Sequence, residues 1–317
     1  MPLSQAQPHS FLRSLFQQLN DLEADFPSLE TLQTLGMQAF QVSMDTEKNG
    51  TLKLNPCFFE PRPEKGLLQM YPLEPGYVEW DQRESMELSP LPSVQDIMDR
   101  AVKKYPPEVA PTLENLRKDD RFDFDMAHDP ESLATELDGL VDIHLDAIRL
   151  QGPYEDFRLA DLKTQRDWDL LPKEDDPPSI QDSPRSKMWE LVSYYRYSWA
   201  DHPRKPHSVL SCLSIVCPTE TYPGISTHEL CAIVCAMLLR VNHKPFSACH
   251  IHPVLVLSYM GNRRARIIQA LYDGQTLVLQ YSPLWNFAEA ETASIEIFVR
   301  YRLSEPVGFN THTLSIR

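Results

Sequence analysis

Three apolar stretches near the C-terminus, separated by short turn-forming sequences, constrain the fold of this chain most strongly. They cover about Ser247–Tyr259, Arg264–Tyr272 and Thr276–Tyr281. Gly261-Asn262 and Asp273-Gly274 lie between them, and pairs of this kind favour tight turns between antiparallel strands. The sequence therefore predicts a three-stranded antiparallel meander.

Helical patterns flank the meander on both sides. Before it, Ser226 and Glu229 have the spacing of a capping box and open an apolar stretch that reaches about Arg240. After it, Ala293–Leu303 carries an apolar face and is followed by Pro306. The sequence predicts a helix–meander–helix core, preceded by a strand at Ser208–Val216 and an aromatic-rich helix at Ser186–Trp199.

The first half of the chain has mainly helical patterns. Phe11–Leu22 repeats apolar residues at helical spacing, and Asp129-Pro130-Glu131 has the capping and first-turn residues of a helix that we expect to end near Gly152. Ala39–Val42 and Thr51–Leu54 flank Asn49-Gly50, which predicts a β-hairpin. The apolar stripe of the helix after Asp129 consists of Leu133, Leu137, Leu140, Val141, Leu145 and Ile148.

Proline and charge divide the chain into two regions. Residues 55–92 form an irregular, proline-rich segment within the mainly helical region 1–171, and residues 172–185 have the composition of a linker. Residues 186–317 then form a second domain that contains the meander. The predicted class is α/β of the α+β type, with a proline-rich acidic N-terminal half.

The charge of the chain is strongly asymmetric. Residues 186–317 contain 12 basic and 9 acidic residues, which leaves 18 basic and 36 acidic residues in 1–185 and a total of −15. A surface of this sign disfavours nucleic acid as a partner. The acidic half is expected to serve solubility, to engage a basic protein partner or to wrap the C-terminal half.

The sequence indicates an intracellular protein, cytoplasmic or nuclear. The N-terminus has neither the basic region nor the apolar run of a secretory signal, and no stretch has the roughly 20 apolar residues that span a bilayer. Six cysteines in a chain of this length do not form a disulfide framework, which points to a reducing compartment.

A concentration of cysteine and histidine between residues 202 and 252 is the main candidate for a metal site. On the predicted helix His228, Cys231 and Cys235 share one face, and on the following strand His250 and His252 share another. Thiolate and imidazole ligands from these two elements could hold zinc. Because the spacings match no common zinc pattern and the cysteines lie in an apolar run, core packing is the favoured interpretation and no cofactor is expected.

Three further hypotheses about a site or activity are left open by the sequence. Cys249 could act as a thiol nucleophile with a histidine from elsewhere in the chain. Aromatic residues could line a cleft, with Trp285, Tyr195 and Trp199 as the candidates. The α-βββ-α order is also that of some nucleases, but the meander offers only Asp273 in a turn and no acid-x-Lys on a strand, so a degenerate relative is the most that this order suggests.

Three C-terminal segments resemble a known group of proteins. His252–Gly261 and Arg266–Ser282, followed by Phe298–Gly308, are similar to the C-terminal part of uncharacterised proteins of filamentous ascomycete fungi. The resemblance covers about 70 residues. It implies a fungal source and, because some such proteins lie beside specialised-metabolite gene clusters, a role near specialised metabolism, but it implies no catalytic residue.

The favoured function is therefore that of a non-enzymatic accessory or interaction protein. An enzyme of specialised metabolism is the alternative, and a degenerate nuclease-like fold is a further one.

Overall fold

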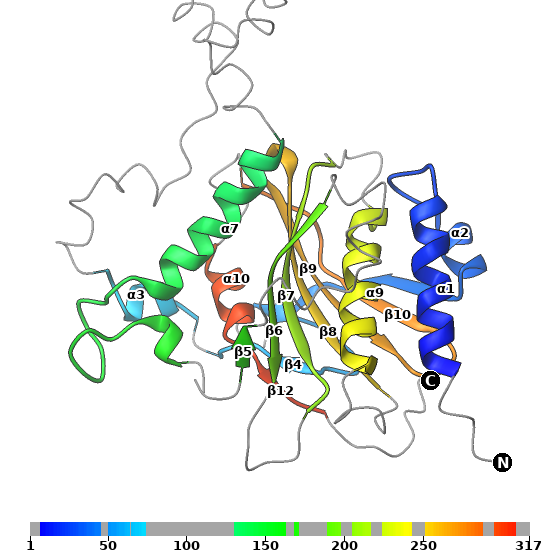
Figure 1. Cartoon of the computed structure of the whole chain (residues 1–317). Helices are drawn as coiled ribbons and strands as arrows, with labels where there is room; N and C mark the ends of the chain where they lie inside the picture. The colour runs from blue at the N-terminus through cyan, green and yellow to red at the C-terminus, as the bar shows by residue number, and fades with distance from the viewer. Residues whose placement is uncertain are drawn as a thin grey trace, which may run out of the picture.

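One mixed β-sheet with helices on both faces organises the part of the chain that the structure describes (Figure 1). The mixed α/β class expected from the sequence is confirmed. The structure is a computed structural model of the 317-residue chain, and it describes residues 7–45, 50–63, 65–73, 130–162, 168–170, 189–197, 205–216, 224–242, 251–287 and 295–308.

Within these residues the sheet has eight strands. Seven follow the order β1, β10, β9, β8, β7, β6, β5, and β11 pairs separately with β9. The strands are β1 (Met37–Gln41), β5 (Trp168–Leu170), β6 (Trp189–Tyr197), β7 (Ser208–Ser214), β8 (Val254–Met260), β9 (Arg264–Tyr272), β10 (Leu277–Tyr281) and β11 (Trp285–Asn286).

The sheet combines antiparallel and parallel strand pairs. β8, β9 and β10 are antiparallel neighbours, whereas β7 is parallel to β8 and β1 is parallel to β10. In the turn before β10, Asp273 accepts hydrogen bonds from the backbone N–H groups of Gln275 and Thr276, both at 2.8 Å. Asp273, the only acidic residue that the predicted meander offered to a nuclease site, thus serves the turn.

One face of the sheet is covered by α1 (Gln7–Asp21) and α9 (Thr227–Asn242) (Figure 1). α9 connects the parallel strands β7 and β8, which require such a crossover. The apolar face of α1 packs against α9 and is almost completely buried through Leu12, Leu15, Phe16 and Leu19. The predicted helix over Phe11–Leu22 therefore exists and covers the crossover helix.

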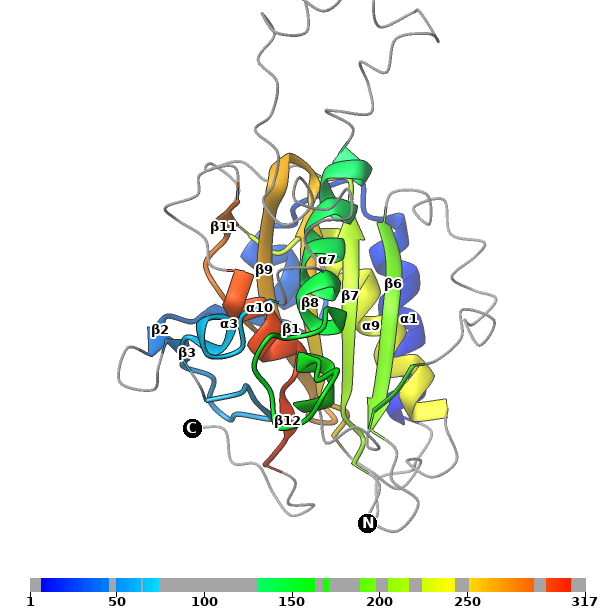
Figure 2. The ribbon, with the colours of Figure 1, turned by 90° about the vertical axis from the view of Figure 1, so that its left-hand side faces the viewer.

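The opposite face carries α7 (Pro130–Asp146), α10 (Ile295–Arg302) and the short helix α3 (Leu67–Met70) (Figure 2). α7 begins at Pro130, as the sequence predicted, and five residues of its expected stripe are buried. The helix ends at Asp146, so Ile148 lies beyond it. Two short ribbons adjoin this face: β2 (Met44–Asp45) with β3 (Thr51–Leu52), and β4 (Phe59–Glu60) with β12 (Glu305–Pro306).

The predicted aromatic-rich helix at Ser186–Trp199 is wrong. Residues 189–197 form β6, which pairs with both β5 and β7. Three tyrosines, one tryptophan and one valine make up more than half of this stretch, and these residue types favour the pleated surface of a sheet. Its apolar spacing also fits a helix, and only the neighbouring strands decide between the two.

The predicted hairpin between Ala39–Val42 and Thr51–Leu54 is also wrong in its pairing. Residues 37–41 form β1 and pair in parallel with β10, more than 230 positions away along the chain. The local hairpin is smaller and joins β2 to β3. Gly50 has a positive φ and directly precedes β3 in this smaller hairpin, whereas β1, which contains Ala39, pairs with β10.

The two regions that the sequence suggested as separate domains contribute to one sheet. β1 belongs to the N-terminal region and β10 to the C-terminal one, and β4 pairs with β12 in the same way. The expected linker 172–185 lies outside the described residues. Among the helices that the structure does describe, none combines the length and the apolarity needed to cross a bilayer.

Candidate functional site

The cysteine and histidine residues proposed as zinc ligands do not converge. His228 contacts Ser214 at the end of β7, whereas His252 precedes β8, whose first residue pairs with Ser208 at the start of β7. A strand of seven residues spans about 20 Å, so these two histidines lie at opposite ends of the sheet. His250 is outside the described residues, and among the described ones no group of three or more His, Cys, Asp or Glu side chains could hold a metal ion.

The cysteines of this region belong to the core between α9 and the sheet. Cys231, Cys235 and Cys212 are all buried there. Burial raises the pKa of the Cys212 thiol well above its ordinary value, and the nearby Glu229 carboxylate raises it further. Since the thiolate is the form that attacks or binds metal, Cys212 is inert under ordinary conditions. Cys249 lies outside the described residues.

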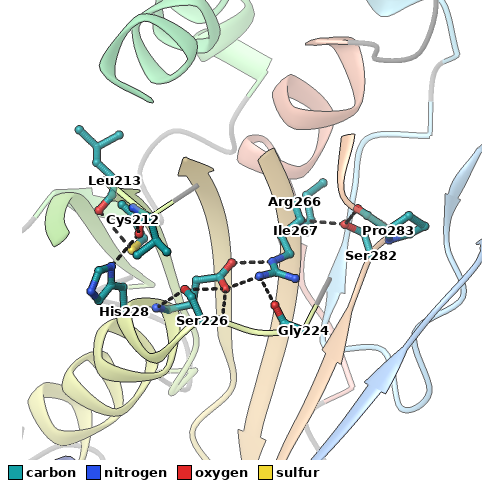
Figure 3. Close-up of polar contacts among 12 residues, drawn as sticks. Cys212, Leu213, Gly224, Ser226, His228, Arg266, Ile267, Ser282 and Pro283 are labelled. Atoms are coloured by element: carbon teal, nitrogen blue, oxygen red, sulfur yellow. Dashed lines mark hydrogen bonds and ion pairs between the residues drawn. The ribbon is translucent and has the colours of Figure 1, made fainter. Parts of the chain in front are cut away.

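On the face of the sheet that α9 covers, a buried ion pair joins Glu229 of α9 to Arg266 of β9 (Figure 3). Arg266 donates from Nε to Oε1 and from Nη2 to Oε2, both at 2.6 Å, and neither side chain is exposed to solvent. Arg266 Nη2 also donates to the Gly224 carbonyl at 2.8 Å. This bidentate pair connects the first turn of α9 to the centre of the sheet.

The capping box predicted from the sequence is confirmed within the same network. Ser226 donates its backbone N–H to Glu229 Oε2 at 2.7 Å, and Glu229 donates its own N–H to Ser226 Oγ at 3.2 Å. Glu229 therefore both caps α9 and neutralises Arg266.

A serine–histidine pair lies beside the ion pair (Figure 3). Ser214 Oγ and His228 Nδ1 are 2.8 Å apart, and both residues are buried. Such a pair can activate a hydroxyl for nucleophilic attack. Here it lies inside the core, where a substrate cannot reach it, and it ties the end of β7 to the first turn of α9.

A second buried polar cluster lies on the opposite face of the sheet. Arg302 of α10 donates from Nη1 to Ser211 Oγ at 2.9 Å, and its Nη2 lies 3.5 Å from Asp142 Oδ1 of α7. Burial raises the pKa of the neighbouring Asp138, although the positive charge of Arg302 opposes this shift. These contacts connect α7, α10 and β7, which is a structural role.

The predicted aromatic cleft is not assembled as expected. Trp285 lies in β11 and packs edge-on against Phe298, with ring centroids 5.4 Å apart. Tyr195 belongs to β6, and β7 and β8 separate that strand from β9, with which β11 pairs. Trp199 is outside the described residues.

An open cavity of about 570 Å³ lies where the two short ribbons meet the end of α10. One wall comes from Asp45 and residues 51–63, and the other from Tyr301 and Val307. The described residues of the lining are Asp45, Thr51, Leu52, Lys53, Leu54, Asn55, Cys57, Glu60, Pro61, Pro63, Tyr301 and Val307. This cavity is the candidate functional site because its polar side chains can be reached from solvent.

Hydrogen bonds from the sheet and from α10 hold the cavity wall in place. Leu52 donates its N–H to Tyr301 Oη at 2.9 Å, and Asn55 donates its N–H to Gln280 Oε1 at 2.6 Å. Gln269 accepts from Phe58 N–H at 2.7 Å and donates to the Pro56 carbonyl at 2.8 Å. Irregular backbone is thus satisfied by buried side chains from distant strands, which preforms the cavity.

Gly308 allows the closest approach of the two walls. Its φ is +71°, and a Cβ built at this position would lie 2.6 Å from the Cys57 carbonyl oxygen. Val307 also donates its N–H to the Phe58 carbonyl at 2.8 Å. Glycine is required here both by the left-handed backbone and by the contact.

The lining combines apolar surface with a small number of polar groups. Burial raises the pKa of Tyr301, so its phenol stays protonated at neutral pH. Cys57 is exposed, and its thiol lies 3.3 Å from the Phe59 carbonyl, to which it donates. Two carboxylates, one ammonium group, one hydroxyl and one amide also belong to the lining, through Asp45, Glu60, Lys53, Thr51 and Asn55.

A buried histidine supports the cavity from behind. His207 packs edge-on against Phe59 and donates from Nε2 to the Val307 carbonyl at 3.2 Å. Burial lowers the pKa of His207 to about 3, and the positive charges of Lys205 and Arg240 favour the neutral form further. The imidazole is therefore a neutral packing element.

His207 makes the stability of the protein depend on pH. An ordinary histidine has a pKa of 6.5, so below that pH the unfolded chain binds a proton that the folded chain excludes. Stability is thus fully present above pH 6.5 and falls toward the folded-state pKa of about 3, by up to about 1.4 kcal/mol per pH unit.

We expect His207→Gln to remove this contribution to the pH slope, as measured by urea denaturation at several pH values. His144, whose pKa burial and then Arg149 lower to about 4, should keep its own contribution in the variant. Identical slopes for the variant and the native chain would contradict the assignment.

Sequence analysis missed the cavity because its walls lie more than 230 residues apart. Two residues carried an indication of it: Gln269 and Gln280 interrupt the inward-facing apolar positions of strands. A buried amide in a strand needs a partner, and irregular backbone is a common one. That indication does not say which segment the partner comes from.

Comparison with known proteins adds no family to this description. No protein-family model, no curated protein and no solved structure matches the chain. The fold and the site define a mixed α/β protein with a preformed, polar-lined cavity beside its sheet.

Proposed function

We propose that this chain is a non-enzymatic accessory protein that binds a small molecule in the cavity between residues 45–63 and 301–307. The observation that carries the proposal is the preformed wall, in which Tyr301, Gln280 and Gln269 fix the backbone of residues 52–58. Its volume of about 570 Å³ falls in the range of roughly 300–1,000 Å³ that small-molecule sites have. A wall that needs no rearrangement also lowers the entropic cost of binding.

The groups in the cavity suit recognition better than chemistry. The protonated phenol of Tyr301 is a hydrogen-bond donor, and its oxygen already accepts from Leu52. The thiol of Cys57 donates to the Phe59 carbonyl. The Ser214–His228 pair, which could have supported catalysis, lies in the core on the other face of the sheet.

The alternative of an enzyme in specialised metabolism depends on Cys57, the nucleophile of the cavity. A binding protein releases its ligand unchanged, whereas an enzyme releases a chemically different product. If the chain comes from a filamentous fungus, as its C-terminal resemblance implies, specialised metabolites are the first ligands to screen.

We expect Asn55→Trp to abolish small-molecule binding. Asn55 is exposed and lines the cavity, so an indole at this position fills it while the backbone N–H can still donate to Gln280. The measurement is the saturable fluorescence of Nile red, a neutral apolar dye, with the native chain and with the variant. Native mass spectrometry of the purified chain checks the same site for a ligand that co-purifies.

Gln17→Trp is the matched control, because it adds the same side chain at an exposed position of α1. This variant should bind Nile red as the native chain does. Equal binding by the native chain and by Asn55→Trp would reject the cavity as the site. If the native chain releases the ligand in chemically altered form and the Cys57→Ser variant releases it unaltered, the result would favour the enzyme.

A further inference from the structure

We infer that the cavity binds a small molecule with an apolar body and a positively charged amine. The inference rests on the proposed function and adds the chemical class of the ligand. Asp45 and Glu60 contribute carboxylates to the lining, whereas Lys53 contributes one ammonium group. Among the residues that the structure describes, the lining therefore carries an excess of one negative charge, which favours a cation over an anion.

The two carboxylates come from separate ribbons. Asp45 belongs to β2, which pairs with β3, and Glu60 belongs to β4, which pairs with β12. An amine has several donors and can bind acceptors from more than one direction. Carboxylates from two ribbons provide such acceptors.

Basic side chains near the cavity are directed to other partners. Arg62 lies 3.6 Å from Glu305, and Lys205 donates to the Pro306 carbonyl at 2.7 Å. Arg300 donates from Nε to the Arg62 carbonyl at 2.6 Å. These cations thus stabilise the ribbon around the cavity, and none of the three is part of its lining.

The remaining lining suits the apolar body of such a ligand. Leucine, proline and valine side chains cover the space between the charged residues, through Leu52, Leu54, Pro61, Pro63 and Val307. A ligand carboxylate would meet this surface together with a net negative charge and would lose hydration without a compensating partner.

Three naphthalene derivatives that differ only in their terminal group test the class: naphthylethylamine, naphthylethanol and naphthylacetate. Isothermal titration calorimetry should show the amine binding about tenfold more tightly than the alcohol, since charge-assisted hydrogen bonds are the stronger kind. The acetate should bind most weakly. Raising the salt concentration should weaken only the amine.

Variants that remove one carboxylate test whether the preference for the amine comes from Asp45 and Glu60. Glu60→Gln and Asp45→Asn should each weaken the amine at least about threefold and leave the alcohol unchanged. Glu30→Gln, at an exposed position of α2 (Leu29–Thr34) away from the lining, is the control and should change nothing.

The outcomes separate the two proposals. If the acetate binds as tightly as the amine, or if both charge variants leave the amine affinity unchanged, the inferred ligand class is wrong. In that case Asn55→Trp still abolishes binding of all three probes, and the cavity stands as the site. If Asn55→Trp leaves every affinity unchanged, the proposed function itself fails.

Discussion

Replacing Arg266 with methionine is expected to lower the free energy of unfolding by about 3–5 kcal/mol. The substitution leaves the Glu229 carboxylate in the core with neither of its two guanidinium contacts, each of which is 2.6 Å long. A buried charge without its partner retains its full desolvation cost. Urea denaturation followed by circular dichroism measures the change.

Two variants separate the charge from the loss of side-chain volume. Glu229→Gln combined with Arg266→Met removes both charges and keeps an amide that can accept from Ser226, so it should recover part of the stability that Arg266→Met loses. Glu305→Gln removes a partner of the exposed Arg62 pair and should cost at most about 1 kcal/mol. A loss below that value for Arg266→Met would contradict the structural role of the buried pair.

A chain of residues 186–317 alone is expected not to fold into a stable structure. Without the N-terminal region, α9 loses the apolar face of α1, β10 loses β1, and the opposite face of the sheet loses α7. Thr227 at the start of α9 also loses its two hydrogen bonds to the carbonyls of Ala24 and Asp25, at 2.6 and 2.8 Å. Burial of these apolar surfaces is the main stabilising contribution that the fragment lacks.

Solubility and a cooperative thermal transition by near-ultraviolet circular dichroism are the measurements. Co-expression with residues 1–171 is the control, because the two fragments together carry every described element, and we expect them to associate and recover the transition. Cooperative unfolding of residues 186–317 without the other fragment would show that the N-terminal region is dispensable to the sheet.

The elements that the sequence predicted well are those whose evidence is local. The capping box of Ser226 and Glu229 lies within one helical turn, and Pro130 at the first position of α7 depends only on its neighbours. β7, β9 and β10 were found because they are rich in apolar residues, and turn residues separate β9 from β10. Local propensity and tertiary packing agree at these positions.

The errors have the opposite origin. β6 has aromatic residues at spacings that suit a helix or a strand, and its two partner strands decide the outcome. β1 precedes a turn sequence but pairs with β10 instead. In both cases the deciding hydrogen bonds run between strands, and a pattern read along the chain does not contain them.

The candidate site shows the same division. The sequence placed His228, Cys231 and Cys235 on one helix, and that placement is correct. In the folded chain all three side chains are buried in the core. The cavity escaped notice because residues 45–63 and Tyr301 meet only in the folded chain. The cysteine and histidine residues that cluster on α9 therefore belong to the core. The accessible site is formed instead by the irregular segment at residues 51–63.

By itself, the amino-acid sequence determined the long helices α1, α7, α9 and α10, the strands β7 to β10 and the capping box of α9, because each depends on side chains within a few residues of one another. Only the tertiary structure decided that both halves share one sheet, that Glu229 pairs with Arg266, and that a cavity opens beside Tyr301. The physical reason is that backbone pairing and charge burial join segments that lie far apart along the chain. Their free energy is gained only once the whole fold has formed.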